Sequence, residues 1–138
     1  MSWGENFFEL PGMGTITDLS ASQFLAVTLD TANALTVKAI SAVTDRPIGI
    51  LQDNPKGTAT ARLAANVATS GVCKAMAGTN GWTRGDRLGV DSTGKLVTIT
   101  EAIATNDNAY TIAIALDSAS ASDIARVKLV DAYLSNHQ

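Results

Sequence analysis

The chain has 138 residues and a net charge of −3, a length that suits one domain able to bury its own core. Hydrophobic residues make up 46% of it but aromatic residues only 5%, so the core must consist mainly of Ala, Val, Ile and Leu. The acidic balance and the scattered basic residues argue against a nucleic-acid ligand, because affinity for phosphate backbones comes from clustered Lys and Arg.

Residues 1–24 differ from the rest of the chain. The aromatic side chains of Trp3, Phe7 and Phe8 fall within the first eight positions, and Leu10 is followed by a Pro-Gly-Met-Gly sequence that disfavours a long regular element. We expect an irregular N-terminal arm that either folds back on its own domain or anchors on a neighbouring subunit or partner. No signal peptide or transmembrane helix is expected, so the sequence predicts synthesis in a cytoplasm and no contact with a membrane.

From residue 25 to the end the pattern is one of short strands separated by turn residues. Strands are predicted at 25–29, 35–43, 48–51, 58–64, 71–76, 87–90, 95–100, 111–116 and 124–130. The strongest turn signals are the Asp-Asn-Pro-Lys-Gly sequence at 53–57 and the Asn-Gly pair at 80–81. An Ala-rich stretch at 101–104 could form a helical turn. Evenly spaced short strands favour an all-β fold, a compact sandwich or small barrel.

The second half of the chain repeats the first. The sequence Ile-Gly-Ile-Leu-Gln-Asp at 48–53 is answered by Ile-Ala-Ile-Ala-Leu-Asp at 112–117, and the same spacing aligns 61–63 with 125–127. Asp30 to Leu35 matches Asp91 to Leu96 at a slightly shorter spacing, which indicates a small insertion. We therefore expect one β domain over 25–138, built from two related units at about 25–76 and 82–134.

The sequence offers no arrangement of residues for catalysis. His137 is the one histidine and lies next to the C-terminal residue, where it cannot serve as a rigidly held base. Cys73 is the one cysteine and lies in a predicted strand, so a zinc site is excluded and a buried role is favoured. The Asp residues stand at turn positions, where Asp is common. We expect no enzyme activity, no cofactor, no metal and no small-molecule substrate.

Arg62 and Arg126 occupy matching positions in the two repeats, on the polar side of predicted strands. They could simply keep edge strands soluble. Alternatively, both could face a subunit boundary and pair with carboxylates of a neighbour, since the planar guanidinium suits such pairing.

The second repeat carries a family likeness. Its segment GWTRGDRLGVDSTGKL at 81–96 is followed by an apolar strand ending in Asp117 and by a last strand containing Arg126. This order resembles tailed-phage capsid cement (decoration) proteins, which carry Gly-Asp-hydrophobic and then Gly-Lys-hydrophobic sequences and are commonly two-fold repeats. The resemblance covers roughly residues 25–130. The first repeat departs from it, with Asp-Thr-Ala-Asn-Ala-Leu at 30–35 where Gly-Lys would be expected.

The resemblance implies a structural virion protein that binds the outer surface of an icosahedral phage head as a homotrimer. Its partners would be the major capsid protein and copies of itself, and it would catalyse no reaction. The aromatic arm (Trp3, Phe7, Phe8 and Leu10) and the two arginines are the candidate contact residues. The alternative is a non-catalytic glycan-binding or adhesion module, for which Trp82 beside polar residues would be the aromatic platform.

Overall fold

The computed structural model describes residues 6–9, 12–105 and 108–136. The all-β prediction is confirmed, with one short helix, α1 (Ile99–Thr105), where the sequence predicted a helical turn. The strands are β1 (Asn6–Glu9), β2 (Gly14–Thr15), β3 (Ala26–Leu29), β4 (Val37–Ala39), β5 (Pro47–Leu51), β6 (Leu63–Ala64), β7 (Val67–Met76), β8 (Arg87–Val90), β9 (Leu96–Thr98), β10 (Asn108–Ala115) and β11 (Ile124–Asn136).

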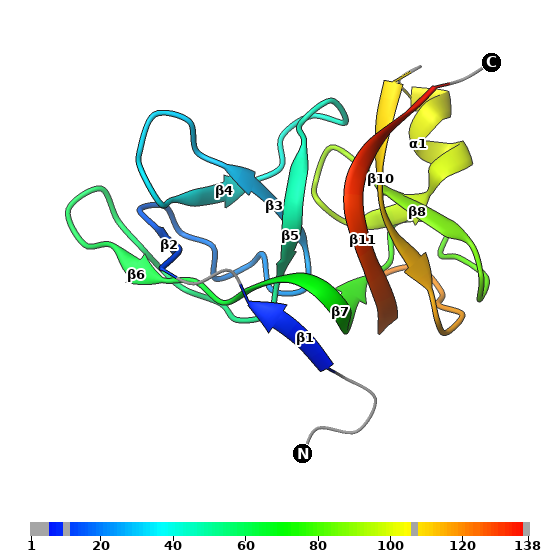
Figure 1. Ribbon diagram of the computed structural model, residues 1–138, viewed down its shortest axis with the longest axis horizontal. Coiled ribbons are helices and arrows are strands. Elements are labelled where there is room, and N and C mark those ends of the chain that lie inside the picture. Colours follow the sequence, from blue (N-terminus) through cyan, green and yellow to red (C-terminus); the bar gives the residue numbers. More distant parts are fainter. Residues whose placement is uncertain (1–5, 10–11, 106–107, 137–138) are drawn as a thin grey trace.

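One curled antiparallel sheet forms most of the molecule, in the shape of a half-barrel (Figure 1). Its strand order is β4-β3-β5-β7-β11-β10-β8-β9, and β1 pairs with β7 outside this path. Strands β2 and β6 form a small second sheet at one end of the molecule. Helix α1 contacts β8, β9 and β10 at the opposite end.

Counted inward from its two edges, the sheet repeats one arrangement of four strands, and this arrangement corresponds to the repeat in the sequence. Strands β3, β4, β5 and β7 form the first unit, and β8, β9, β10 and β11 form the second in the same pairing pattern. The two units meet where β7 pairs with β11, from Met76 opposite Ile124 to Gly71 opposite Leu129. Each unit therefore supplies the neighbour that the other needs to complete its sheet.

Backbone hydrogen bonds identify which residues of the two units correspond. In the first hairpin the N–H of Asp30 donates to the carbonyl oxygen of Thr36 (2.8 Å). In the second hairpin the N–H of Asp91 donates to the carbonyl oxygen of Lys95 (3.0 Å). The first turn is thus the longer one, and its insertion lies between these two bonded residues.

This correspondence matches Leu35 with Gly94, and so corrects the sequence alignment, which had matched Leu35 with Leu96. Both residues have a left-handed backbone, with φ of 55° at Leu35 and 89° at Gly94. Phe24 (φ 66°) likewise corresponds to Gly85 (φ 93°). A non-glycine residue in this region costs about 1–2 kcal/mol, so at these two positions the first unit carries strain that the second avoids.

The arm that the sequence predicted as irregular contributes two strands within its described residues. Strand β1 pairs with β7, with Phe7 opposite Gly71, and β2 pairs with β6. Phe7 packs against the main core, and Leu19 is buried in a second cluster. The free edge of β7 explains β1, because its unpaired backbone groups are satisfied by an added strand.

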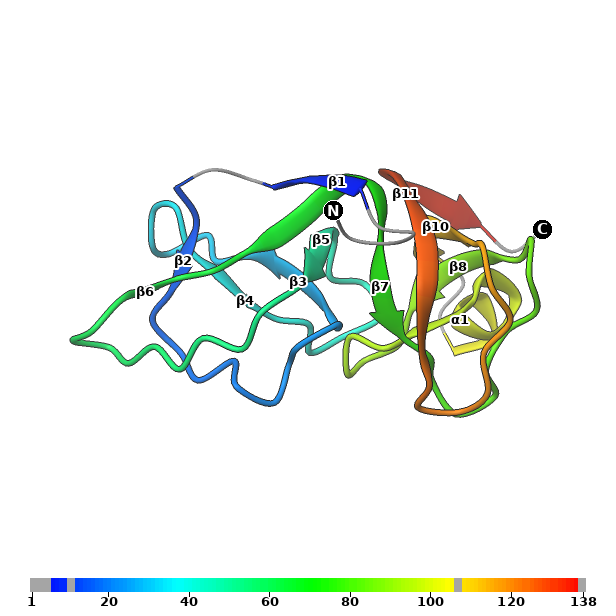
Figure 2. The same cartoon turned by 90° about the horizontal axis from the view of Figure 1, so that it is seen from below.

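Strand β7 holds β5 and β11 on the same edge. Ala68 pairs with both Ile50 of β5 and Glu9 of β1, so β5 lies opposite β1. Val72 pairs with both Lys128 of β11 and Asn6 of β1, so β11 also lies opposite β1. Strand β7 bends near β1 (Figure 2), and β5 and β11 rise next to each other from it (Figure 1).

Candidate interaction surfaces

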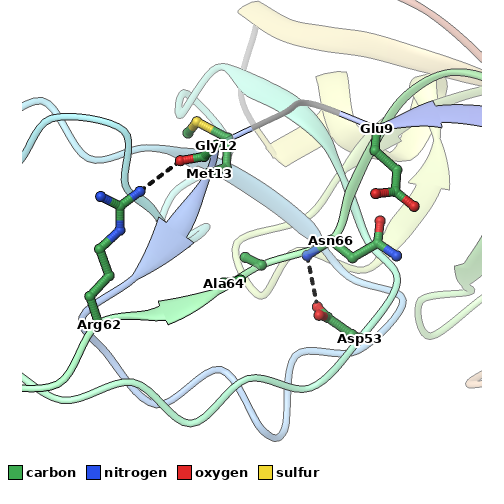
Figure 3. A pocket seen from close by; sticks show the side chains of 8 residues that line it. Glu9, Gly12, Met13, Asp53, Arg62, Ala64 and Asn66 are labelled. Carbon is green, nitrogen blue, oxygen red and sulfur yellow. Dashed lines mark hydrogen bonds between the residues drawn. The ribbon is translucent and has the colours of Figure 1, made fainter.

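Arg62 forms hydrogen bonds with backbone carbonyls of its own chain. It lies just before β6, and its Nη2 donates to the carbonyl oxygens of Gly12 (2.7 Å) and Leu35 (2.6 Å). The carbonyl of Leu35 also accepts the N–H of Gly14 (3.0 Å). Arg62 therefore ties the turn at 30–36, the first-hairpin turn, to the segment that enters β2. Figure 3 shows the bond to Gly12.

Arg126 makes a different contact, with a residue of its own unit. On β11 its Nε and Nη2 donate to the two carboxylate oxygens of Asp117, at 2.7 Å and 3.1 Å. This bidentate hydrogen bond lowers the pKa of Asp117 and raises that of Arg126. Both side chains are partly exposed, so water screens the pair and it adds little to stability.

The predicted equivalence of the two arginines is wrong. The carbonyl of Arg126 accepts the N–H of Leu116 (3.1 Å), and in the first unit the carbonyl of Asn66 accepts the N–H of Gln52 (2.8 Å). Arg126 therefore corresponds to Asn66, while Arg62 lies in an excursion that the second unit lacks. The alignment assumed that the spacing between matching residues of the two units is constant. That spacing changes after β5 and β10, because the first unit has an insertion before β6 and the second has a shorter turn after β10.

Acid should weaken the fold through several turn carboxylates. Hydrogen bonds lower the pKa of Asp18 (from Ser20), Asp30 (from Asn33), Asp45 (from the Ser41 N–H) and Asp117 (from Arg126). A depressed folded pKa contributes stability above the unfolded pKa of about 4, and that stability is lost as the pH falls through the folded pKa. We expect the thermal midpoint to hold from about pH 7 to pH 5 and to fall below about pH 4. An Asp117→Asn variant should show a smaller acid drop, and an identical drop would contradict its contribution.

Trp82 lies in the core and not in a surface groove. It is 5% exposed, and its Nε1 donates to the carbonyl oxygen of Asp117 (2.7 Å). Its backbone exchanges two hydrogen bonds with Ala119, which fixes the loop at 118–123. The aromatic platform that the glycan-binding alternative needed is therefore closed to a sugar ring.

A pocket of about 560 Å³ lies between β1, β6 and the segments that lead into β2 and β7 (Figure 3). Asp53 accepts the N–H of Asn66 at 3.1 Å within it, and Glu9 and Arg62 stand on other walls. The side-chain oxygen of Asn66 is buried and has no hydrogen-bond partner among the described residues. The pocket has a wide mouth, and both Arg62 and Asp53 already form hydrogen bonds within the chain.

A second hollow, the β5–β11 groove, has a volume of about 460 Å³. It lies on the edge of β7 that β5 and β11 share, with Thr69 of β7 among its lining residues. Leu29, Ile48 and Leu129 give it apolar walls, and the exposed Arg46 and Asp131 also line it. Of these apolar residues Leu29 is exposed, Ile48 is half-buried and Leu129 is buried.

Large apolar side chains are exposed at several separate places on the molecule. They are Phe8, Leu29, Leu35, Leu63, Ile124, Tyr133 and Leu134. Phe8 on β1 is 73% exposed, while its neighbour Phe7 is half-buried. Of the other predicted arm contacts, Trp3 and Leu10 lie outside the described residues.

No cluster of three or more His, Cys, Asp or Glu side chains that could hold a metal ion occurs at 6–9, 12–105 or 108–136. Within those ranges no helix is long and apolar enough to cross a membrane. Comparison with protein-family models and with curated protein sequences finds no match to this chain.

Proposed function

We propose that this chain is a capsid cement protein, which binds the outer surface of an icosahedral phage head as a homotrimer and stabilises contacts between major capsid subunits. The observation that carries the proposal is the combination of a rigid, hydrogen-bonded β body with exposed apolar side chains on several of its edges. In this proposal the exposed side chains are the candidate contact points with neighbouring subunits. The likeness of the segment at 81–96 to cement proteins supplies the partner.

The physics of a trimer suits this task. Three identical contacts engage one lattice together, so weak individual contacts add through their effective concentration. The low fraction of charged residues, 17%, limits the number of ions that must lose water when the surfaces meet. Phe8 is the described arm residue that best fits a contact with the capsid, because aromatic side chains dominate binding energies at interfaces.

The test uses heads of the phage that encodes this chain, prepared without it, and measures co-sedimentation of the added protein. We expect saturable binding, and light scattering should give a solution mass near three times 14.3 kDa. Phe8→Ser should weaken binding at least tenfold, the loss of about 1.4 kcal/mol at a contact, and leave the thermal midpoint unchanged. Absence of binding by the wild-type protein would refute the proposal.

Phe7→Ser is the matched control for this variant. Phe7 and Phe8 are neighbours on β1 but point to opposite sides of the strand, and Phe7 packs against the core. We expect Phe7→Ser to lower the thermal midpoint, while any folded fraction still binds heads. A deletion of residues 2–10 would not isolate the contact, because it removes β1, which pairs with β7 in the folded sheet.

A further inference from the structure

Leu35 is an exposed leucine held in a strained backbone conformation. It has φ of 55° and is 59% exposed, so its side chain gains little from burial to offset the strain. Its carbonyl is nevertheless held by Arg62 and Gly14. The first-hairpin turn thus presents an apolar side chain on a rigid support, and such preorganisation lowers the entropy lost when a partner binds.

Both turns are docked within the chain through the carbonyl at this position, but the turn of the second unit leaves no apolar side chain exposed there. Gly94 stands at the position of Leu35, and its carbonyl accepts the N–H of Ala26 in the first unit (2.8 Å). A Cβ at Gly94 would lie 2.9 Å from the Ala26 carbonyl oxygen, so this turn packs closely against its neighbour. The first-hairpin turn carries a longer loop and a leucine, and that leucine is left uncovered.

The β5–β11 groove has the chemistry to receive this turn. The two legs of the first hairpin carry Asp30 and Lys38, and the groove carries the opposite charges in Arg46 and Asp131. Its apolar walls suit a leucine side chain, and its volume of about 460 Å³ can hold more than one side chain. The turn and the groove are thus complementary in both polarity and charge.

We propose that the first-hairpin turn of one copy of this chain docks into the β5–β11 groove of a second copy, with Leu35 as the anchor. Asp30 then faces the neighbour's Arg46, and Lys38 faces the neighbour's Asp131. In a homotrimer this contact is heterologous, because the turn of each copy enters the groove of the next copy until the ring closes. The inference rests on the homotrimer of the proposed function and names the surfaces that build it.

Disulfide trapping between two single-cysteine variants tests the contact directly. Leu35→Cys and Ala132→Cys proteins are purified separately, mixed and mildly oxidised, with Ala132 chosen because it lines the groove. We expect a covalent heterodimer in the mixture, since a disulfide forms only between cysteines whose Cα atoms approach within about 7 Å. The native Cys73 is buried and adds little background.

Ile124→Cys is the matched control, because Ile124 is exposed on the same strand at the end away from the groove. It should not cross-link with Leu35→Cys. Equal cross-linking of both mixtures, or none in either, would overturn the proposal.

A second variant separates docking from folding. Asn tolerates the left-handed backbone better than Leu, so the Leu35→Asn protein should stay folded while its solution mass falls towards 14.3 kDa. A Leu35→Asn protein that remains a trimer would refute this docking mode. If heads still bind this trimer, the proposed cement function stands and only the docking mode is refuted. The two proposals can therefore be distinguished.

Discussion

Gly49→Ala is expected to lower the free energy of unfolding by about 3 kcal/mol. Gly49 lies in β5, where that strand meets β7. A Cβ at this position would lie 2.2 Å from the Ala68 carbonyl oxygen and 2.7 Å from Val67 Cγ1. Backbone atoms of a central strand cannot move aside without breaking the pairing of Ile50 with Ala68. Urea denaturation followed by circular dichroism measures the loss.

Ala113→Gly is the matched control, because Ala113 of β10 occupies the corresponding position in the second unit. The second unit accepts a methyl group there, and its removal should cost only about 1 kcal/mol. If Gly49→Ala unfolds at the same urea concentration as the wild-type protein, the close approach of β5 and β7 is not a constraint on the fold.

Trp82→Ala should have a similarly large effect, about 3–5 kcal/mol. The substitution empties a core position that is 5% exposed and removes the donor to the Asp117 carbonyl. It also loosens the loop at 118–123, whose Ala119 is paired with Trp82. Urea denaturation of the same kind measures this effect.

Trp82→Phe provides the comparison, because it keeps an aromatic ring and loses the indole N–H. It should cost less than half as much as Trp82→Ala. Wild-type stability in both variants would contradict a core role for Trp82. Head binding by the folded Trp82→Phe protein should be unchanged, because a buried ring makes no contact with a partner.

Local pattern predicted the elements whose pairing partners lie next to them in the chain. The strands expected at 87–90, 111–116 and 124–130 are β8, β10 and the first half of β11, because alternating β-branched residues between turn signals carry a local preference. The strand expected at 58–64 is reduced to β6 at 63–64, and 67–70 of β7 was missed. β6 pairs with β2 and the start of β7 pairs with β1, and both of these partners lie far from them in sequence.

By itself, the sequence determined the all-β class, the two-fold repeat and the Asp-based turns, because each depends on short-range propensity or on direct comparison of two segments. Only the tertiary structure decided which residues of the two units correspond: Leu35 corresponds to Gly94, and Asn66 corresponds to Arg126. It also showed that Arg62, which the sequence placed in a strand, donates hydrogen bonds to two backbone carbonyls. Insertions shift sequence spacing without changing strand pairing, so correspondence is set by backbone hydrogen bonds that close over long loops.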